Sequence, residues 1–256
     1  MKEDTSNKEK YILTSVDNTL SLLNLFFDYE ELSVNDAAKL LGLSRSTVFR
    51  FMVTLENRGF LSKTDHATYR LGLNMFSLGM LAYNRMELAA LIHPYLQDIA
   101  RQTGETSHLG IVDDGIHIMF IDRALGTSQL KMETALGYRQ LAHHTASGKA
   151  ILGFQSDQVI REYIKRVSFQ KLTPASLGDA GELLHLLDQV KREGYACDNE
   201  ESELGLTCFA VPIVDATGRA VASISISGPT TRMKTHKKSH IVLLKHTVDE
   251  LSRTLR

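Results

Sequence analysis

Residues 33–55, SVNDAAKLLGLSRSTVFRFMVTL, decide how the first part of the chain folds. Ser33 followed by Asp36 is a capping box that starts a helix, Gly42 marks a tight turn, and Ser44 caps a second helix. Helical spacing relates the apolar residues in two sets, Val34, Ala37, Ala38 and Leu41, then Val48, Phe51, Met52 and Leu55. Each set predicts one buried stripe, so the stretch predicts a helix-turn-helix.

The flanking residues extend this unit in both directions. A third apolar set with the same spacing predicts a supporting helix with a buried stripe, made by Val16, Leu20, Leu23 and Phe27. Two β-like runs, 59–63 and 68–71, follow the second helix and are joined by a turn at 64–66. Such a hairpin is typical of a wing, so residues 11–72 are predicted to form a winged helix-turn-helix domain.

The helix capped by Ser44 carries side chains that suit DNA. Opposite its buried stripe lie small polar, aromatic and arginine side chains, and no acid occurs between Ser44 and Glu56. Such a face fits the major groove, where these side chains reach base edges. An ordinary solvated helix face is the alternative, but the capped turn and the wing favour DNA. The predicted contacts to double-stranded operator DNA are Ser44, Arg45, Ser46, Thr47, Phe49, Arg50, Lys63 and Arg70.

Length, charge and cysteine usage narrow the class of protein. The chain has 256 residues and a formal net charge of -1, so attraction to nucleic acid must be local. Residues 1–10 are predicted to be a disordered arm. With no signal-peptide core and no membrane-length apolar run, we expect a cytoplasmic protein without a membrane partner. Cys197 and Cys208 lack metal-like spacing and are expected to be reduced thiols.

Residues 73–86 are predicted to form a linker helix that is apolar on nearly every side. Its apolar members are Leu73, Met75, Phe76, Leu78, Met80, Leu81 and Tyr83. A helix apolar all round has to be buried, and packing on the same helix of a second chain would bury it. Paired DNA half-sites favour such a two-fold axis. Folding back on the chain's own second domain is the alternative.

Residues 87–256 mix helices with hairpin-joined strands, which predicts an α+β domain with helices packed on an antiparallel sheet. Helices are expected at 88–101 with an interruption at Pro94, and at 146–154, 159–166, 183–193 and 236–255. Strands are expected at 106–112, 116–123, 130–134, 195–199, 206–214 and 220–227.

The last two strands carry a polar pattern that can hold a ligand. Side chains alternate along a strand, so one face of the last strand carries Ser223, Ser225 and Ser227. Cys208 and Ala210 share one face of the preceding strand. If the hairpin brings these small faces together, they leave room for a small polar molecule, which Asp198 could also face. Serines that simply face water are the alternative, and the pattern alone slightly favours it.

Motifs for catalysis or metal binding are weak. Residues 147–150, SGKA, lack the hydroxyl residue and the first glycine of a phosphate loop, and no nucleophile elbow occurs. His143 and His144 are a poor metal pair because neighbours on a strand point apart. Glu200 and Glu203 are expected in a solvated loop. No catalytic residue, metal site or cofactor is predicted.

Nearly the whole chain from Ser15 resembles the IclR-type bacterial transcriptional regulators. The matching stretches are 15–20 (SVDNTL), 43–50 (LSRSTVFR), 69–72 (YRLG), 104–106 (GET), 144–150 (HTASGKA), 194–201 (GYACDNEE), 205–208 (GLTC) and 225–229 (SISGP). The resemblance implies a winged helix-turn-helix, a linker helix and a GAF-like effector domain. It also implies a homodimer through the DNA-binding part, and often a homotetramer.

In such proteins the effector is a small organic acid, sugar acid or aromatic catabolite, and it lies near a helix start and the late strands. The positions that match here are Ala146, Ser147, Asp198, Cys208, Ser225 and Ser227. Backbone N–H groups at the helix start would meet a carboxylate. The family often has proline where Leu141 or Ala142 stands, and His143 is unusual there, so the entrance to the pocket is expected to differ.

The sequence therefore predicts a repressor of a catabolic operon, whose DNA binding a small acid controls by shifting a conformational population. Two other classes remain open from the residues alone. One is an enzyme on the same kind of sheet, and the other is an interaction module that does not bind operator DNA.

Overall fold

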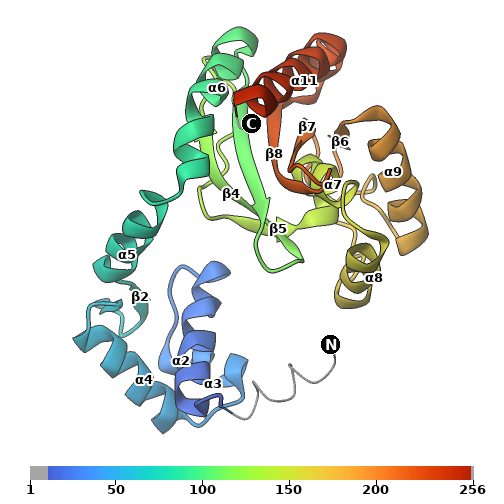
Figure 1. The fold of residues 1–256 in the computed structure, drawn as a ribbon. Helices are drawn as coiled ribbons and strands as arrows, with labels where there is room; N and C mark the ends of the chain where they lie inside the picture. The colour runs from blue at the N-terminus through green and yellow to red at the C-terminus, as the bar shows by residue number, and fades with distance from the viewer. Residues whose placement is uncertain (1–10, 255–256) are drawn as a thin grey trace. The chain divides into compact units, whose positions relative to one another are not determined.

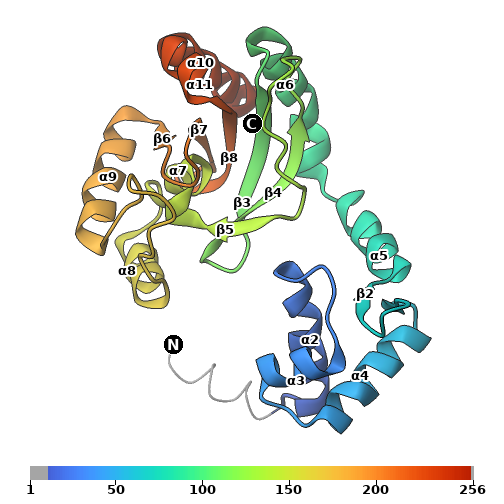
Figure 2. The same ribbon diagram turned by 180° about the vertical axis from the view of Figure 1, so that it is seen from behind.

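The computed structural model describes residues 11–254, so the arm predicted at Met1 to Lys10 and the helix end at Leu255 lie outside the described residues. The chain divides into two compact units, of which the first ends at Arg85 and the second begins at Met86. Figures 1 and 2 show the elements of each unit from opposite sides. Among residues 11–254, no helix has both the length and the apolar character needed to cross a membrane.

The first unit consists of short helices followed by a small hairpin and a further helix. Its elements are α2 (Thr14–Asn24), η1 (Leu25–Phe27), α3 (Val34–Leu41), α4 (Arg45–Asn57), β1 (Leu61–Lys63), β2 (Tyr69–Leu71) and α5 (Leu73–Tyr83). The strands β1 and β2 pair antiparallel, and Leu32 adds an isolated bridge to Tyr69. The predicted winged helix-turn-helix is confirmed, with both wing strands shorter than expected.

The turn between α3 and α4 is held as its residues predict. The hydroxyl of Ser33 accepts the N–H of Asp36, and the hydroxyl of Ser44 accepts the N–H of Thr47, each at 3.2 Å. Gly42 ends α3 with φ at 65°, a left-handed conformation in which a side chain is strained. These contacts satisfy N–H groups that the start of a helix leaves free.

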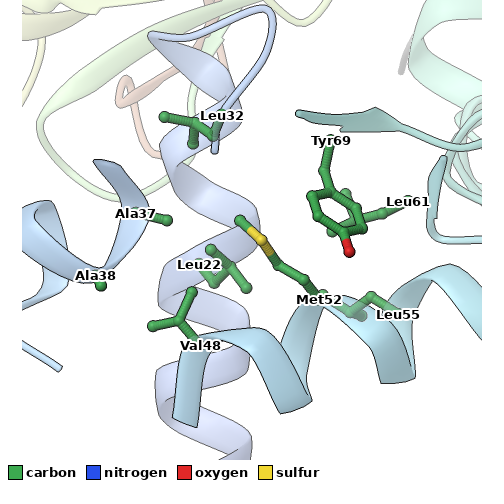
Figure 3. Close-up of a cluster of buried hydrophobic side chains, with 9 residues drawn as sticks. All are labelled: Leu22, Leu32, Ala37, Ala38, Val48, Met52, Leu55, Leu61 and Tyr69. Carbon is green, nitrogen blue, oxygen red and sulfur yellow. The ribbon is translucent and has the colours of Figure 1, made fainter. Parts of the chain in front are cut away.

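One hydrophobic core holds this unit together, and Figure 3 shows it. Its buried members are Leu22, Leu32, Ala37, Ala38, Val48, Met52, Leu55, Leu61 and Tyr69. The stripes predicted for α3 and α4 point into it, but most of the stripe predicted for the supporting helix does not. On α2, Leu22 is fully buried and Leu23 packs against the core, whereas Val16 and Leu20 are 52 % and 54 % exposed. Phe27 of η1 is 59 % exposed. The spacing of these residues is helical, but the predicted burial of Val16, Leu20 and Phe27 was wrong for the single chain.

Helix α5 also leaves its apolar side chains exposed. No residue of α5 is buried, and Leu73, Phe76, Leu78 and Leu81 are each more than half exposed. Large exposed apolar surfaces are typical of interaction sites.

The second unit is built on an antiparallel sheet. Within the described residues, six strands lie in the order β5-β4-β3-β8-β7-β6. They are β3 (Thr106–Val112), β4 (His117–Ala124), β5 (Arg139–Leu141), β6 (Ala196–Asn199), β7 (Leu206–Val214) and β8 (Ala220–Pro229). The predicted α+β class is confirmed.

Helices cover both faces of this sheet. They are α6 (Glu87–Thr103), η2 (Ala142–His144), α7 (Ala146–Leu152), α8 (Asp157–Arg166), α9 (Ala180–Glu193), α10 (Thr230–Thr235) and α11 (Lys237–Thr254). In Figures 1 and 2, α6 and α11 lie along one face of the sheet, and α7 packs on the other. Helices α8 and α9 join α7 through a further apolar cluster that includes Leu152, Tyr163 and Leu183.

Two expectations for this unit were wrong in detail. Pro94 lies inside a continuous α6 and does not interrupt it. Residues 130–134 form no strand, and the strand that pairs with β4 on the side away from β3 is Arg139–Leu141. The closing helix expected at 236–255 is α11, and the short α10 before it was not predicted.

Candidate functional site

The face of α4 opposite the core is open to solvent. Arg45, Ser46 and Arg50 are exposed, and Phe49 is 50 % exposed. Ser44 and Thr47, predicted as DNA contacts, are joined to each other by the helix cap and by a contact of 2.8 Å between their hydroxyls. The Ser46 hydroxyl also lies 3.0 Å from that of Ser44, so these three hydroxyls are less free for further hydrogen bonds than the arginines.

The wing presents the two remaining residues predicted to contact DNA. Lys63 on β1 and Arg70 on β2 are both exposed. The Nε of Arg70 donates to the hydroxyl of Ser62 at 3.4 Å, and the Lys63 ammonium lies 5.9 Å from the centre of the Tyr69 ring. Both contacts orient a cation on the hairpin while leaving it accessible. All eight predicted DNA contacts thus lie within α4, its cap and the wing.

A cavity of about 250 Å³ lies in the second unit, between the sheet and the start of α7. It has room for about eight water molecules at about 30 Å³ each. The lining residues are Phe120, Met132, Glu133, Thr134, Ala135, Tyr138, Gln140, Thr145, Ala146, Ser147, Asp198, Ser202, Glu203, Leu206, Cys208, Ser225 and Ser227. All six predicted effector residues are among them.

Strand register explains how the floor of the cavity forms. Cys208 pairs with Ser227, which also pairs with Thr106, and Asp198 pairs with Cys208 from the other side. Paired residues on neighbouring strands carry their side chains on one face, so these form a row across the sheet. The next row contains Ala210, Ser225 and His108. The small faces of β7 and β8 therefore meet as predicted, and the serines are buried rather than facing water.

The start of α7 forms a second wall. The Thr145 side chain accepts the N–H of Gly148 at 2.9 Å. The N–H groups of Ala146 and Ser147 lie in the first turn of α7, where no earlier carbonyl of the helix can accept them. A Cβ at Gly148 would lie 2.2 Å from the carbonyl oxygen of Ala142, so only glycine lets α7 start this close to η2. Ser147 is 2 % exposed, and its Oγ has no hydrogen-bond partner among the described residues.

Asp198 faces the cavity but is largely occupied by its own loop. Its carboxylate accepts the N–H of Glu201 at 2.8 Å, the N–H of Ser202 at 3.3 Å and the hydroxyl of Ser202 at 2.6 Å. Glu201 in turn accepts from Lys149 of α7 at 2.6 Å, and the Lys149 side chain is fully buried. The ion pair joins α7 to the loop that carries the lining residues Ser202 and Glu203.

The remaining acidic residues of this loop differ in their surroundings. Glu203 is exposed, as expected for a solvated loop, although it also lines the cavity. Glu200 is not simply solvated, because its carboxylate accepts the N–H of Gly205 at 2.8 Å and the hydroxyl of Thr230 at 3.2 Å.

The charged side chains that line the cavity are acidic, and its thiol is neutral. Glu133, Asp198 and Glu203 are acidic, and no lysine, arginine or histidine lines the cavity within residues 11–254. Burial raises the pKa of the Cys208 thiol, and the nearby Asp198 charge raises it further. The thiol is therefore neutral at neutral pH and offers only weak hydrogen bonding.

Sequence reasoning missed the wall made by residues 132–138. Side chains from other elements donate hydrogen bonds to carbonyl groups in this segment and just before it. Thr106 donates to the carbonyl of Met132 at 2.7 Å, Arg123 to that of Thr134, and Arg232 to that of Leu130 at 2.6 Å. Such contacts join residues far apart in the chain and leave no local pattern. The available signal for this wall was the Gly104-Glu105-Thr106 motif, because Thr106 and Glu105 both take part in these contacts. The Glu105 carboxylate accepts a hydrogen bond from Arg232.

A different entrance to the pocket was expected from Leu141, Ala142 and His143, and this stays a prediction. His143 is fully buried, and none of the three is among the described residues that line the cavity. His143 and His144 were also expected to point apart on a strand, but they lie in η2 with ring centroids 4.2 Å apart. The hydroxyl of Tyr163 contacts His143 Nδ1 at 2.6 Å. Within residues 11–254, no cluster of three or more His, Cys, Asp or Glu side chains could hold a metal ion.

Family comparisons cover both units. The family model for the IclR helix-turn-helix domain matches residues 15–65, and the model for the bacterial transcriptional regulator IclR C-terminal matches residues 80–253. The chain is 32 % identical over 242 residues to the HTH-type transcriptional regulator KdgR of Dickeya chrysanthemi, covering 94 % of this chain and 79 % of that protein. It is 30 % identical over 203 residues to the transcriptional repressor IclR of Escherichia coli, covering 78 % of this chain and 74 % of that protein.

Solved structures agree with the fold. The crystal structure of the Thermotoga maritima IclR shares 32 % identity, covers 94 % of this chain and 98 % of that one, and has a TM-score of 0.70. The crystal structure of an IclR homolog of Microbacterium hydrocarbonoxydans in complex with 4-hydroxybenzoate has a TM-score of 0.76. The match covers 91 % of this chain and 95 % of that one. Its identity is 20 %, so this second likeness is one of fold alone.

Proposed function

The chain belongs to the IclR family of bacterial transcriptional regulators, and from that premise we propose that it is a cytoplasmic repressor of a catabolic operon controlled by a small organic acid. The observation that carries the proposal is the cavity, whose lining includes the six predicted residues from four separate parts of the chain. Backbone N–H groups of Ala146 and Ser147 favour a carboxylate, and the serines favour its hydroxyl or keto groups. The relatives KdgR and IclR are transcriptional regulators, which argues against an enzymatic function for this chain.

DNA recognition is assigned to the exposed face of α4 and to the wing. Arg50 is exposed and lies on the face opposite Val48 and Met52, so it would reach a base or a phosphate. The hydroxyls of Ser46 and Thr47 would serve as shorter contacts. The repressor role itself is supported by the name of the Escherichia coli relative.

Arg50→Ala should weaken binding to the DNA upstream of the chain's own gene by about 1–3 kcal/mol, with the fold intact. The reason is that an exposed arginine contributes to the DNA complex and little to the core. Gel-shift titrations at matched salt measure this, with Arg161→Ala on the exposed part of α8 as a control of equal charge. Equal affinities for wild type and Arg50→Ala would refute the assignment. Repeating the wild-type titration with short keto acids and sugar acids tests acid control, which fails if none changes the affinity.

A homodimer is proposed to form through exposed apolar side chains of the first unit. Leu73, Phe76, Leu78 and Leu81 of α5 form one group, and Val16, Leu20 and Phe27 form another. A second copy would remove these side chains from water and place two α4 helices for paired half-sites. Contacts between second units would extend the dimer to a homotetramer.

Replacing both Phe76 and Leu78 by glutamate should split or unfold the assembly. Both side chains are more than half exposed in the single chain, so the change leaves the monomer core intact but would bury charge at the contact. Light scattering measures the mass, and a matched control is Leu184→Glu on α9, which is 46 % exposed. An unchanged mass for the double variant would show that α5 is not the interface.

A further inference from the structure

One buried polar side chain next to the cavity belongs to none of the matched motifs. His108 on β3 pairs with Ser225 of β8, so the two side chains lie side by side on one face of the sheet. The centroid of the His108 ring also lies 5.2 Å from that of the Phe120 ring. Ser225 and Phe120 both line the cavity, whereas His108 is their neighbour just outside the lining.

His108 has unused hydrogen-bonding capacity. It is 1 % exposed, and neither Nδ1 nor Nε2 has a hydrogen-bond partner among residues 11–254. Packing against Phe120 alone would explain an aromatic ring here but not an imidazole, because buried polar atoms without partners are destabilising. Two polar nitrogens at this place indicate a polar partner that enters the cavity.

The ionisation state of His108 defines what that partner can be. Burial lowers the pKa of His108 to about 4, and the charge of Arg123 lowers it as well, so the ring is neutral at neutral pH. A neutral imidazole has one N–H donor and one acceptor nitrogen. A hydroxyl group also donates and accepts, whereas a carboxylate only accepts.

The rest of the cavity favours a single carboxylate on the ligand. The helix start offers the N–H groups of Ala146 and Ser147, and the buried Oγ of Ser147 lacks a partner among the described residues. Elsewhere the charged lining residues are Glu133, Asp198 and Glu203. A second carboxylate would lie near like charges and would meet no lining cation in the described part of the chain.

We propose that His108 determines ligand specificity: the site takes a hydroxylated monocarboxylic acid, recognises one of its hydroxyls at His108 beside Ser225, and rejects dicarboxylic acids. The inference rests on the proposed control by a small acid. It adds a residue and a chemical class to that site. A ligand oriented this way has its carboxylate at α7 and its hydroxyls over β8 and β3.

Calorimetry with three six-carbon acids tests the proposal: hexanoate without hydroxyls, gluconate with hydroxyls, and glucarate with a second carboxylate. Wild type should bind gluconate at least about tenfold more tightly than the other two. His108→Leu should lose about tenfold for gluconate and less than about twofold for hexanoate, which corresponds to one hydrogen bond. His108→Gln, which keeps a donor and an acceptor, should stay within about threefold of wild type.

Controls separate specificity from structure. Ser223→Ala removes a buried hydroxyl from the same strand face, one row beyond the pair of His108 and Ser225, and should leave all three affinities unchanged. Nitrogen NMR of wild type should show the His108 ring shifting with gluconate, assigned by its loss in His108→Gln, so a poorly folded His108→Leu does not decide the matter.

Three outcomes would overturn the proposal. Equal losses for gluconate and hexanoate in His108→Leu would leave His108 a packing residue, and no ring shift would place the hydroxyls elsewhere. If wild type binds its upstream DNA but none of the acids, the inference fails together with acid control. If acids bind and release DNA while His108→Leu changes nothing, the inference alone fails.

Discussion

Replacing Lys149 by methionine should destabilise the second unit by about 3–5 kcal/mol, because it leaves the carboxylate of Glu201 buried without its cation. The Lys149 side chain is fully buried, that of Glu201 is 12 % exposed, and the two groups lie 2.6 Å apart. Burial already raises the pKa of Glu201, and the Lys149 charge acts in the opposite direction. Methionine keeps the length and apolar stem of the lysine, so the lost charge is the main change.

Urea unfolding followed by circular dichroism measures this loss. The matched control is Lys165→Met, since Lys165 pairs with Glu162 on an exposed turn of α8, where water screens the charges, and the loss of stability should be much smaller. Adding Glu201→Gln to Lys149→Met should recover more than half of the lost stability, because it removes the unpaired charge. Similar losses for Lys149→Met and Lys165→Met would contradict the role given to burial.

Ser225→Leu should abolish the response to the acid while DNA affinity stays within about twofold of wild type. Ser225 is 2 % exposed, and its side chain lies at the middle of the cavity floor between Ala210 and His108. A leucine there would fill space that the ligand needs. The neighbours Ile224 and Ile226 point to the opposite face, so the core between the sheet and α6 is undisturbed.

Calorimetry with the acids and gel shifts with the upstream DNA measure the two parts of this expectation. Val221→Leu is the matched control, because Val221 lies on the same strand with 46 % of its surface exposed. Undiminished acid affinity in Ser225→Leu would place the ligand elsewhere in the protein. Lost DNA affinity without acid would show that the substitution acts through the fold.

Local signals explain which parts of the fold could be predicted from the sequence. The caps at Ser33 and Ser44 involve residues three apart, so they are visible in the chain itself. Alternation likewise placed Ser225 and Ser227 on one face of β8, and Cys208 and Ala210 on one face of β7, and the register shows that these faces meet. The resemblance to the family then indicated that this face is covered rather than solvated, which alternation alone does not reveal.

Contacts between distant residues explain the failures. Helical spacing shows that Val16 and Leu20 share a stripe, but not whether the monomer or another molecule covers it. Residues 130–134 have strand-like composition, yet Thr106 and Arg232 hold the carbonyls on this stretch through their side chains. His108 carried no signal at all, because its importance comes from Ser225 and Phe120 on two other strands.

The half-buried thiol of Cys208 has a consequence for oxidative stress. Oxidants and alkylating reagents attack the thiolate, and burial raises the pKa of this thiol, so little thiolate forms at neutral pH. Small reagents that enter the cavity would therefore meet an inert sulfhydryl. Ligand sensing by this regulator should stay insulated from the redox state of the cell, although a cysteine lies in the middle of its sensor.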